Sequence, residues 1–415
     1  MILQQTRGAL SSGDQLALDL PFAATKSLAA RIGPTPTFTR ASSGTYFGPL
    51  VTIGGVTLFR TTGIQSSRAF WEYAAGEGDI YQLYYTGTMW ELRIQLAAAE
   101  DPTYHSAVAG SEWRPDQANW SGSGVSVTPS STFGIVRSAN NEPRFDHNTV
   151  TPFACKGLLI EESRTNAILQ SDTLTTQTIT VTAVSRTLSF YGSGTVVLSG
   201  AAIATVAGSG AFPTRTTLTF TPTAGSLILT VTGTVQFAQL ETGSFATSYI
   251  PTTTASVIRS ADVCSISGSA FTGFYNQSEG SFACNYAITT GFTGNRYAAS
   301  IEDTIGGTQN GFIFRSTNVA AMFVAGSGPI STIGAVSTGA SKHILAYSGI
   351  NEFVYVKDSV VGTTTGSGTR DPSLPIRMSI GALEGFNAFT LCGHIARIQY
   401  FRKRLPNAKL QALTA

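Results

Sequence analysis

Charged residues are scarce in this sequence. Asp, Glu, Lys and Arg make up 12% of its 415 residues, about half of the ~25% that is typical of soluble domains. The formal net charge is +2, and the one run of basic residues is 402–404. The chain therefore lacks the basic surface that nucleic-acid binding needs. So weakly charged a surface can pack closely against other copies or other subunits, because little ionic desolvation has to be overcome.

Long apolar runs, paired cysteines and clustered histidines are also missing. No stretch reaches the ~18 consecutive apolar residues of a membrane-spanning helix, and the N-terminus lacks the basic region and apolar core of a secretory signal. The histidines are not spaced for metal ligation, and no C-x-x-C pair occurs. We expect no membrane insertion, no metal and no cofactor. We also expect the cysteines to be buried and free, in a reducing compartment: Cys155, Cys264, Cys284 and Cys392.

One crowded charged stretch, residues 141–166, stands out in a chain built mainly from Thr, Ser, Gly and aliphatic residues. It reads NEPRFDHNTVTPFACKGLLIEESRTN. Three aliphatic residues at 158–160 precede a charged cluster, which predicts a short buried strand that turns out to solvent. We expect the stretch to form a structural junction, with His147 as part of it.

Two separated blocks carry a resemblance to a known family. FTRASSGTYF at 38–47, and PRFDH at 143–147 with GLLIEESRTN at 157–166, resemble the opening of a family of bacteriophage and prophage virion proteins. The resemblance implies a virion surface protein, assembled in the bacterial host cytoplasm alongside other virion proteins of the capsid or tail. A missing secretory signal suits a virion that is released by lysis. In the relatives the two blocks lie a few tens of residues apart, whereas here residues 48–132 widen the gap.

Residues 48–132 predict a separate inserted β-module. All four tryptophans of the chain fall here. The segments 79–85 and 88–96 alternate at period two on either side of Thr86-Gly87, which predicts a β-hairpin with one aromatic and one polar face. Aromatic rings either pack in a core or stack on the apolar faces of sugars. Five of them are candidate carbohydrate contacts: Trp71, Tyr85, Trp90, Trp113 and Trp120.

Two further regions predict antiparallel sandwiches. Residues 173–258 hold five or more short Thr-rich segments with β-branched or aromatic residues at alternate positions. Their end, QFAQLETGSFATSYI at 236–250, resembles the closing strand of carbohydrate-binding-module-like jelly rolls. Residues 259–415 contain EGSFACNY at 279–286 and end with a GHIARIQYF strand that leads through RLPNA to a short helix. These features resemble a concanavalin A-like, laminin-G-like sandwich.

Catalytic patterns are missing from these regions. Glucanases of the concanavalin A-like group use closely spaced carboxylates on one strand face, and the acidic residues after 259 form no E-x-D-x-x-E pattern. The nearest match, Glu77 and Asp79 followed by Gln82, lies in the inserted module. No histidine lies near a G-x-S-x-G elbow. We expect no catalytic residue and no enzymatic activity.

The sequence therefore predicts an all-β chain of several antiparallel β-sandwich (jelly-roll) domains in series, with one inserted small β-module. The predicted function is a structural protein of the virion surface, a fibre or spike adhesin that binds host-cell polysaccharide. A capsid decoration protein that binds no glycan is the alternative, and a glycan-degrading spike is the third. Weak surface charge favours a homo-oligomer, a trimer if the protein is a fibre. The expected domains are 1–47 with 133–172 as an N-terminal attachment region, 48–132 as the insert, 173–258 as one sandwich and 259–415 as the other.

Overall fold

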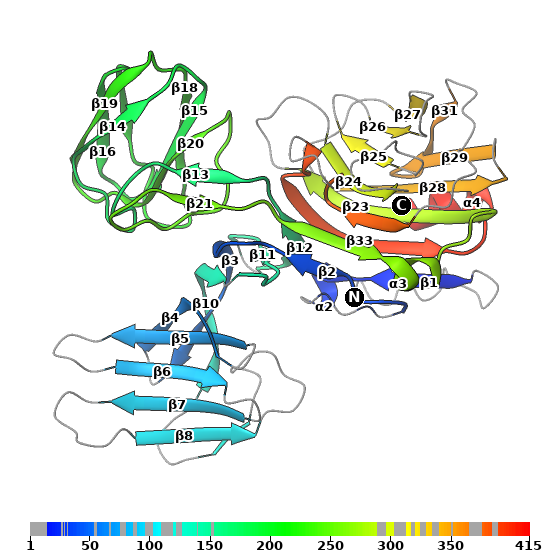
Figure 1. Ribbon diagram of the computed structural model, residues 1–415, viewed down its shortest axis with the longest axis horizontal. Coiled ribbons are helices and arrows are strands. Elements are labelled where there is room, and N and C mark those ends of the chain that lie inside the picture. The colour runs from blue at the N-terminus through cyan, green and yellow to red at the C-terminus, as the bar shows by residue number, and fades with distance from the viewer. Residues whose placement is uncertain are drawn as a thin grey trace. The chain divides into compact units, whose positions relative to one another are not determined.

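The computed structural model divides into two compact units, which are described separately (Figure 1). Strands dominate and form several antiparallel sheets, so the predicted all-β fold class is confirmed. The structure describes residues 15–25, 28, 30, 32–53, 56–65, 68–74, 80–85, 89–95, 103–108, 119–121, 127–138, 140–150, 153–288, 296–302, 313–316, 320–323, 329–333, 340–349, 352–364, 376–383 and 389–415.

The first unit comprises Met1–Arg40, Cys155–Ser163 and Ser260–Ala415. One of its sheets runs β12-β33-β23-β28-β29-β30, with β1 also paired to β33. These strands are β1 (Leu16–Leu20), β12 (Cys155–Ile160), β23 (Glu279–Ile288), β28 (Ser341–Ser348), β29 (Glu352–Lys357), β30 (Val360–Val361) and β33 (Gly393–Phe401).

The other sheet of this unit runs β2-β22-β32-β24-β25-β26-β27-β31. Contacts join β23 to β24 and β27 to β29, so the two sheets form a sandwich. The strands are β2 (Thr37–Thr39), β22 (Val263–Ser267), β24 (Arg296–Glu302), β25 (Ile313–Ser316), β26 (Ala320–Phe323), β27 (Pro329–Ile333), β31 (Thr363–Thr364) and β32 (Arg377–Ile380).

Strands from the N-terminal part of the chain complete this sandwich. Leu18 of β1 is paired with Tyr400, and Leu158 of β12 with Ile395, so both strands lie against β33. β1 is followed by the single helical turn α2 (Phe22–Thr25). The first residues of the predicted attachment region thus belong to the same fold as the C-terminal residues.

The sequence GLLI that ends β12 has a steric explanation. Gly157 has a φ of +114°, and a Cβ atom at this position would lie 2.1 Å from the carbonyl oxygen of Ile395. Only glycine fits so close to the neighbouring strand. The following Leu158 and Ile160 are fully buried, as expected for the predicted short buried strand. The predicted exposure of the charged cluster after it is wrong for Glu161 and Arg164, which are buried as well.

The C-terminal strand and helix are those that the sequence predicts. β33 leads to α4 (Asn407–Thr414), and Pro406 directly precedes the helix, where a missing N–H costs nothing. Leu410 is buried in a cluster with Ala283 and Ile344 on the β23-β28 side of the sheet, and Leu413 packs against the same cluster. All four cysteines are free; three are buried and Cys155 is half-buried.

The second unit comprises Ala41–Ala154 and Arg164–Arg259. Its first part is an eight-stranded sheet in the order β10-β3-β4-β5-β6-β7-β8-β9 (Figure 1). The strands are β3 (Gly44–Ile53), β4 (Val56–Gln65), β5 (Arg68–Ala74), β6 (Ile80–Tyr85), β7 (Met89–Gln95), β8 (Thr103–Val108), β9 (Asn119–Ser121) and β10 (Val127–Ser138). β6 and β7 form the predicted hairpin, with Tyr85 paired to Trp90.

The strands that enter and leave the predicted insert pair with each other. Gly44 is the partner of Ser138, Phe47 of Ile135 and Gly48 of Gly134. The chain therefore leaves the surrounding fold and returns to it at the same place. Inserted segments are tolerated where their ends lie together in this way.

Removing the insert tests whether it folds separately. Joining Phe47 to Phe133 through a short Gly-Ser linker should give a soluble protein with one cooperative melting transition, because the pairing of Phe47 with Ile135 can persist. Differential scanning calorimetry of the shortened chain measures this. Insoluble expression, or a broad transition, would show that residues 48–132 are integral to the core.

The rest of the second unit is a sandwich. A four-stranded sheet β14-β19-β16-β17 faces a three-stranded sheet β18-β15-β20, and Val196, Leu229, Leu188 and Leu240 from the two sheets share one core. β13 (Arg164–Asn166) and β21 (Val257–Arg259) pair where the chain enters and leaves. The strands are β14 (Gln177–Val181), β15 (Arg186–Tyr191), β16 (Thr195–Gly200), β17 (Ala204–Ala207), β18 (Thr216–Phe220), β19 (Gly225–Thr232) and β20 (Gln236–Thr242).

The charged stretch at 141–166 is largely buried and binds backbone groups. In the second unit the Arg144 side chain is fully buried, and its Nη1 donates to the Thr45 carbonyl at 2.9 Å. The Phe47 N–H donates to Asp146 Oδ1 at 2.7 Å. His147 Nδ1 lies 3.1 Å from the Phe47 carbonyl. PRFDH therefore fixes the strand β3 of FTRASSGTYF, which explains why the two blocks occur together.

Candidate functional site

Three of the five predicted carbohydrate contacts lie in one row across the module sheet. The Cα register pairs Tyr85 with Trp90, Trp90 with Ala107, and Ala107 with Trp120. Directly paired residues lie on the same face of an antiparallel sheet. We call Tyr85, Trp90 and Trp120 the aromatic row.

The other two candidates lie elsewhere. Trp71 on β5 is paired with Leu83, two positions before Tyr85 on β6, so it lies on the face of the aromatic row but outside the row itself. Trp113 lies outside the described residues. Tyr84, next to Tyr85, is paired with Glu91 and lies on the opposite face.

A second group of aromatic residues lies in the sandwich of the same unit. The rings of Tyr191 and Phe212 are 5.2 Å apart, and those of Tyr191 and Phe237 are 6.2 Å apart. All three rings are half-buried. Phe47 of β3 packs against Phe212 at 5.2 Å, and the Arg215 guanidinium lies 5.9 Å from the Tyr191 ring centre. We call Tyr191, Phe212 and Phe237 the sandwich cluster.

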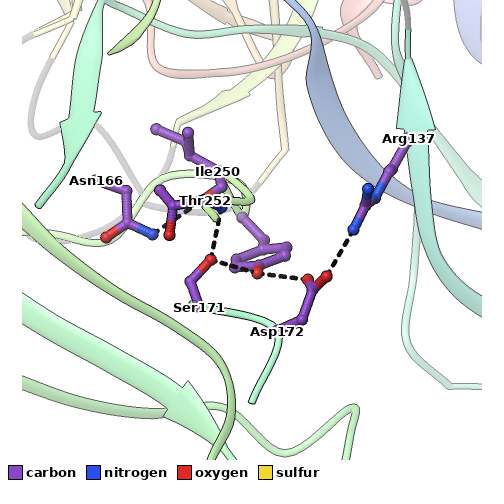
Figure 2. Close-up of polar contacts among 7 residues, drawn as sticks. Arg137, Asn166, Ser171, Asp172, Ile250 and Thr252 are labelled. Carbon is purple, nitrogen blue, oxygen red and sulfur yellow. Dashed lines mark hydrogen bonds and ion pairs between the residues drawn. The ribbon is translucent and has the colours of Figure 1, made fainter. Parts of the chain in front are cut away.

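Tyr249 connects this cluster to a polar network. Its ring packs against Phe237 at 5.4 Å, and its hydroxyl donates to Asp172 Oδ1 at 2.7 Å (Figure 2). Burial, and then the hydrogen bond to Asp172, raise the pKa of Tyr249, so the hydroxyl stays protonated and can donate. Asp172 also accepts from Arg137 Nη2 at 2.9 Å, an ion pair whose side chains are 37% and 52% exposed.

The buried end of the network holds the chain segment after β20 in place. Ser171 Oγ lies 2.6 Å from the Tyr249 hydroxyl and accepts from the Thr252 N–H at 2.8 Å. Asn166 Nδ2 donates to the carbonyls of Ala238 at 3.0 Å and Ile250 at 2.8 Å, the second of which is drawn in Figure 2. Asn166, the last residue of GLLIEESRTN, therefore has a structural role.

A buried carboxyl group lies under the same segment. Glu241 on β20 is fully buried, and its Oε2 accepts from Gln239 Nε2 at 2.7 Å and from the Thr247 N–H at 3.0 Å. Burial raises the pKa of Glu241, while Arg215 and the Thr247 hydrogen bonds act in the opposite direction. No other carboxylate among the described contacts joins Glu241, so a pair of carboxylates for glycoside hydrolysis is not assembled there.

The sequence did not single out the sandwich cluster or Arg215. Tyr191, Phe212 and Phe237 are far apart along the chain, and each follows or precedes a turn in a Thr-rich run. One signal was available: Arg186 and Arg215 are the only charged residues between Asp172 and Glu241. An isolated arginine in such an uncharged run indicates a position at which the arginine side chain makes a polar contact in the fold.

Metal sites and membrane-spanning helices are absent from the described part of the chain. No group of three or more His, Cys, Asp and Glu side chains there could hold a metal ion. No helix there is long and apolar enough to cross a membrane. Among the histidines whose burial is described, His343 is the most deeply buried, at 0% exposure, and its partners are interior side chains of the first unit.

Comparisons with known proteins give distant structural likenesses. No protein-family model matches the chain, and no curated protein matches its sequence. A sialidase CBM40 of Ruminococcus gnavus bound to α2,3-sialyllactose is similar at 15% identity and a TM-score of 0.29, over 35% of this chain and 88% of that one. A Trypanosoma rangeli sialidase in complex with 2,3-difluorosialic acid is similar at 6% identity and a TM-score of 0.31, over 86% of this chain and 52% of that one. The LG1-3 region of the laminin α2 chain is similar at 7% identity and a TM-score of 0.19. Likenesses at these scores carry no argument about function.

Proposed function

We propose that this chain is a non-enzymatic structural protein of a bacteriophage virion surface, which binds host-cell polysaccharide through its module at 48–132. The observation that carries the proposal is the aromatic row: Tyr85, Trp90 and Trp120 share one face and one cross-strand register of the module sheet. Aromatic rings aligned in this way match the repeated apolar faces of a sugar chain.

The spacing within the row suits an extended polysaccharide. Neighbouring strands are about 4.8 Å apart, so Trp90 and Trp120, with the strand of Ala107 between them, are separated by about 10 Å. Successive sugar rings of a linear chain can therefore reach successive aromatic residues.

The virion assignment rests on the two sequence blocks. FTRASSGTYF and PRFDH–GLLIEESRTN resemble virion proteins, and in this chain the buried side chains of Arg144 and Asp146 form hydrogen bonds to the backbone of the first block. The two blocks thus serve as a scaffold, and we assign ligand binding to the insert between them. Antibodies raised against the chain should label intact particles in electron micrographs; unlabelled particles would count against the virion role.

Trp120→Ala tests glycan binding. One stacked ring contributes on the order of 1 kcal/mol, so the affinity for host capsular polysaccharide or lipopolysaccharide should fall about fivefold, with the melting temperature nearly unchanged. Isothermal titration calorimetry with purified polysaccharide measures the loss.

The matched control is Tyr84→Ala, which removes an aromatic residue from the opposite face of the same sheet. It should leave polysaccharide affinity as in the unaltered chain. Equal losses for both variants would contradict a binding face, and a large fall in melting temperature for Trp120→Ala would make that ring a core residue. A chain that binds no host polysaccharide would favour the decoration role.

A further inference from the structure

The four-stranded sheet of the sandwich in the second unit turns a surface without charge away from the core. Its inward positions are apolar and buried, such as Val196, Leu198, Leu227 and Leu229. Its outward positions are exposed or half-buried and carry only hydroxyl or small apolar side chains. We call these residues the uncharged face: Thr178, Thr180, Thr195, Val197, Ser199, Thr205, Ala207, Ser226, Ile228, Thr230 and Thr232.

The lack of charge extends to the loops around this face. Between Asp172 and Glu241 the sequence holds two charged residues, Arg186 and Arg215. Arg186 begins β15 and Arg215 directly precedes β18, so both belong to the three-stranded sheet. Protein surfaces ordinarily carry about a quarter to a third charged residues, mixed in sign. A whole sheet face with none is therefore a departure from an ordinary solvated surface.

The face is also regular. Cross-strand pairs put Thr232 beside Thr195, and Thr230 beside Val197, which in turn pairs with Thr205. The outward side chains of this sheet are all Thr, Ser, Ala, Val or Ile. Val197 and Ile228 near its middle are each 38% exposed, and Ile203 in the loop between β16 and β17 is 91% exposed. The apolar side chains of the uncharged face are thus surrounded by hydroxyl groups.

The opposite side of the same sandwich differs, because the chain covers it. The outward face of the three-stranded sheet bears Glu241 and Gln239, and Thr247 binds both side chains. Arg215 Nη1 donates to the Thr247 carbonyl at 2.6 Å, and Thr219 Oγ1 donates to the Ser244 carbonyl at 3.2 Å. The polar face is therefore buried by the chain's own segment, while the uncharged face stays open.

We infer that the uncharged face is an interface with the same face of a second copy of this chain. A twofold interface brings a surface against itself, so any charge near the axis meets its own copy and repels it. A face without charge has no such repulsion and little ionic desolvation cost. A hydroxyl group both donates and accepts, so each Thr or Ser can pair with the same residue type across the axis. Flat sheets stack face to face about 10 Å apart.

Other partners fit this surface less well. Sugar sites need aromatic rings and planar polar groups such as amides, carboxylates or guanidinium groups, and no outward position of the sheet has one. A strongly charged partner would find nothing here to complement its charge. A second copy offers the same mixture of methyl and hydroxyl groups.

The size of the face predicts a weak contact. Four strands about 4.8 Å apart, and about 20 Å long on average, give an area of about 400 Å² per copy. Twice this area is below the ~1,200 Å² of a standard stable interface. We therefore expect association in the high micromolar range, which becomes strong where many copies are held together on one particle.

Sedimentation velocity from about 1 µM to about 500 µM tests the interface, since this range brackets weak micromolar complexes. The unaltered chain should shift from monomer to dimer with concentration. Thr230→Lys places like charges in the middle of the face and should raise the dissociation constant at least about tenfold. The matched control is Thr217→Lys on the three-stranded sheet, where Thr217 is also exposed; it should associate as the unaltered chain does.

A mixture of charge variants tests whether the face meets itself. Thr230→Lys and Thr230→Glu should each associate poorly alone, and an equimolar mixture should associate at least as well as the unaltered chain. A monomer at every concentration, or equal effects of Thr230→Lys and Thr217→Lys, would overturn the inference. Weak association of each variant without recovery in the mixture would overturn the face-to-face arrangement. The test does not involve the aromatic row, so it succeeds or fails independently of polysaccharide binding.

Discussion

Acidification from pH 7 to pH 4 is expected to destabilise the first unit by about 3 kcal/mol through His343 alone. This histidine on β28 has 0% exposure, and burial lowers its pKa to about 3, against the smaller opposing effect of Asp358. Lys357 lowers the pKa further. The folded chain therefore holds the ring in its neutral form across the ordinary pH range.

Hydrogen bonding explains why the proton is excluded. Ser341 Oγ donates its one proton to Asp358 Oδ2 at 2.8 Å. Ser341 Oγ must therefore act as the acceptor towards the ring, and it accepts from His343 Nε2–H at 2.8 Å. Tyr355 then donates its hydroxyl proton to Nδ1. A second ring proton would point at the Tyr355 hydroxyl proton, and this hydroxyl would have to turn in a buried site. The ring of Tyr286, with its centre 4.8 Å from that of His343, closes another side.

The direction of the pH effect on stability follows from the pKa values of His343 in the unfolded and in the folded chain. His343 titrates near 6.5 in the unfolded chain and at about 3 in the folded chain, so between these values the unfolded chain binds more protons. Stability is fully present above pH 6.5 and is lost as the pH falls towards 3. The full loss amounts to about 5 kcal/mol, from about 1.4 kcal/mol per pH unit.

Urea denaturation of the unaltered chain and of His343→Gln at pH 7 and pH 4 measures the effect. The variant is less stable at pH 7 but should lose about 3 kcal/mol less on acidification. His394→Gln is the matched control, because it removes a half-buried histidine from β33 and keeps His343; it should retain the pH dependence of the unaltered chain. An equal pH dependence in His343→Gln would contradict the assignment.

Asp262→Asn is expected to cost about 3–5 kcal/mol, because it removes the carboxylate charge that pairs with the buried guanidinium of Arg40. Arg40 Nη1 lies 3.2 Å from Asp262 Oδ1, and both side chains have 0% exposure. Asp262 Oδ2 also accepts from the Glu161 N–H at 2.8 Å, and the Asp262 N–H donates back to the Glu161 carbonyl at 3.0 Å. One carboxylate thus joins both sequence blocks to the strand β22.

The measurement is again the free energy of unfolding in urea. Arg137→Met provides the contrast, since it removes an ion pair whose side chains are exposed and should cost no more than about 1 kcal/mol. The double variant Arg40→Met with Asp262→Asn should recover part of the loss, because no charge is then left buried alone. A loss of under about 1 kcal/mol for Asp262→Asn would contradict the role of the pair.

Sequence periodicity predicted the helices and strands that have one apolar and one polar face. The hairpin β6–β7, the strand β33 and the helix α4 all follow alternation or spacing that can be read within a few residues. The strands β16 and β17 escaped prediction: the run from Thr195 to Ala207 is interrupted by Gly200 and alanines, which weaken the alternation.

Partners distant in the chain could not be predicted from periodicity. β1 and β2 are short, and nothing within them shows that they pair with β33 and β22, respectively. The same limit applies to the sandwich cluster, because Tyr191, Phe212 and Phe237 meet only through the fold. The motif residues Arg144, Asp146 and Asn166 were readily located in the sequence, but their backbone partners depend on tertiary contacts.

The position of β33 has a consequence for the order of folding during synthesis. β33 pairs with β1, β12 and β23, and it follows all the other described strands in chain order, so it is made after them. Until then the edges of β1 and β12 that pair with β33 stay open, although both strands are made much earlier. An open strand edge can pair with another nascent chain. All residues of the second unit, by contrast, precede Ser260, so this unit can close while the first is still incomplete. Nascent chains halted before residue 393 thus expose the edges of β1, β12 and β23 together.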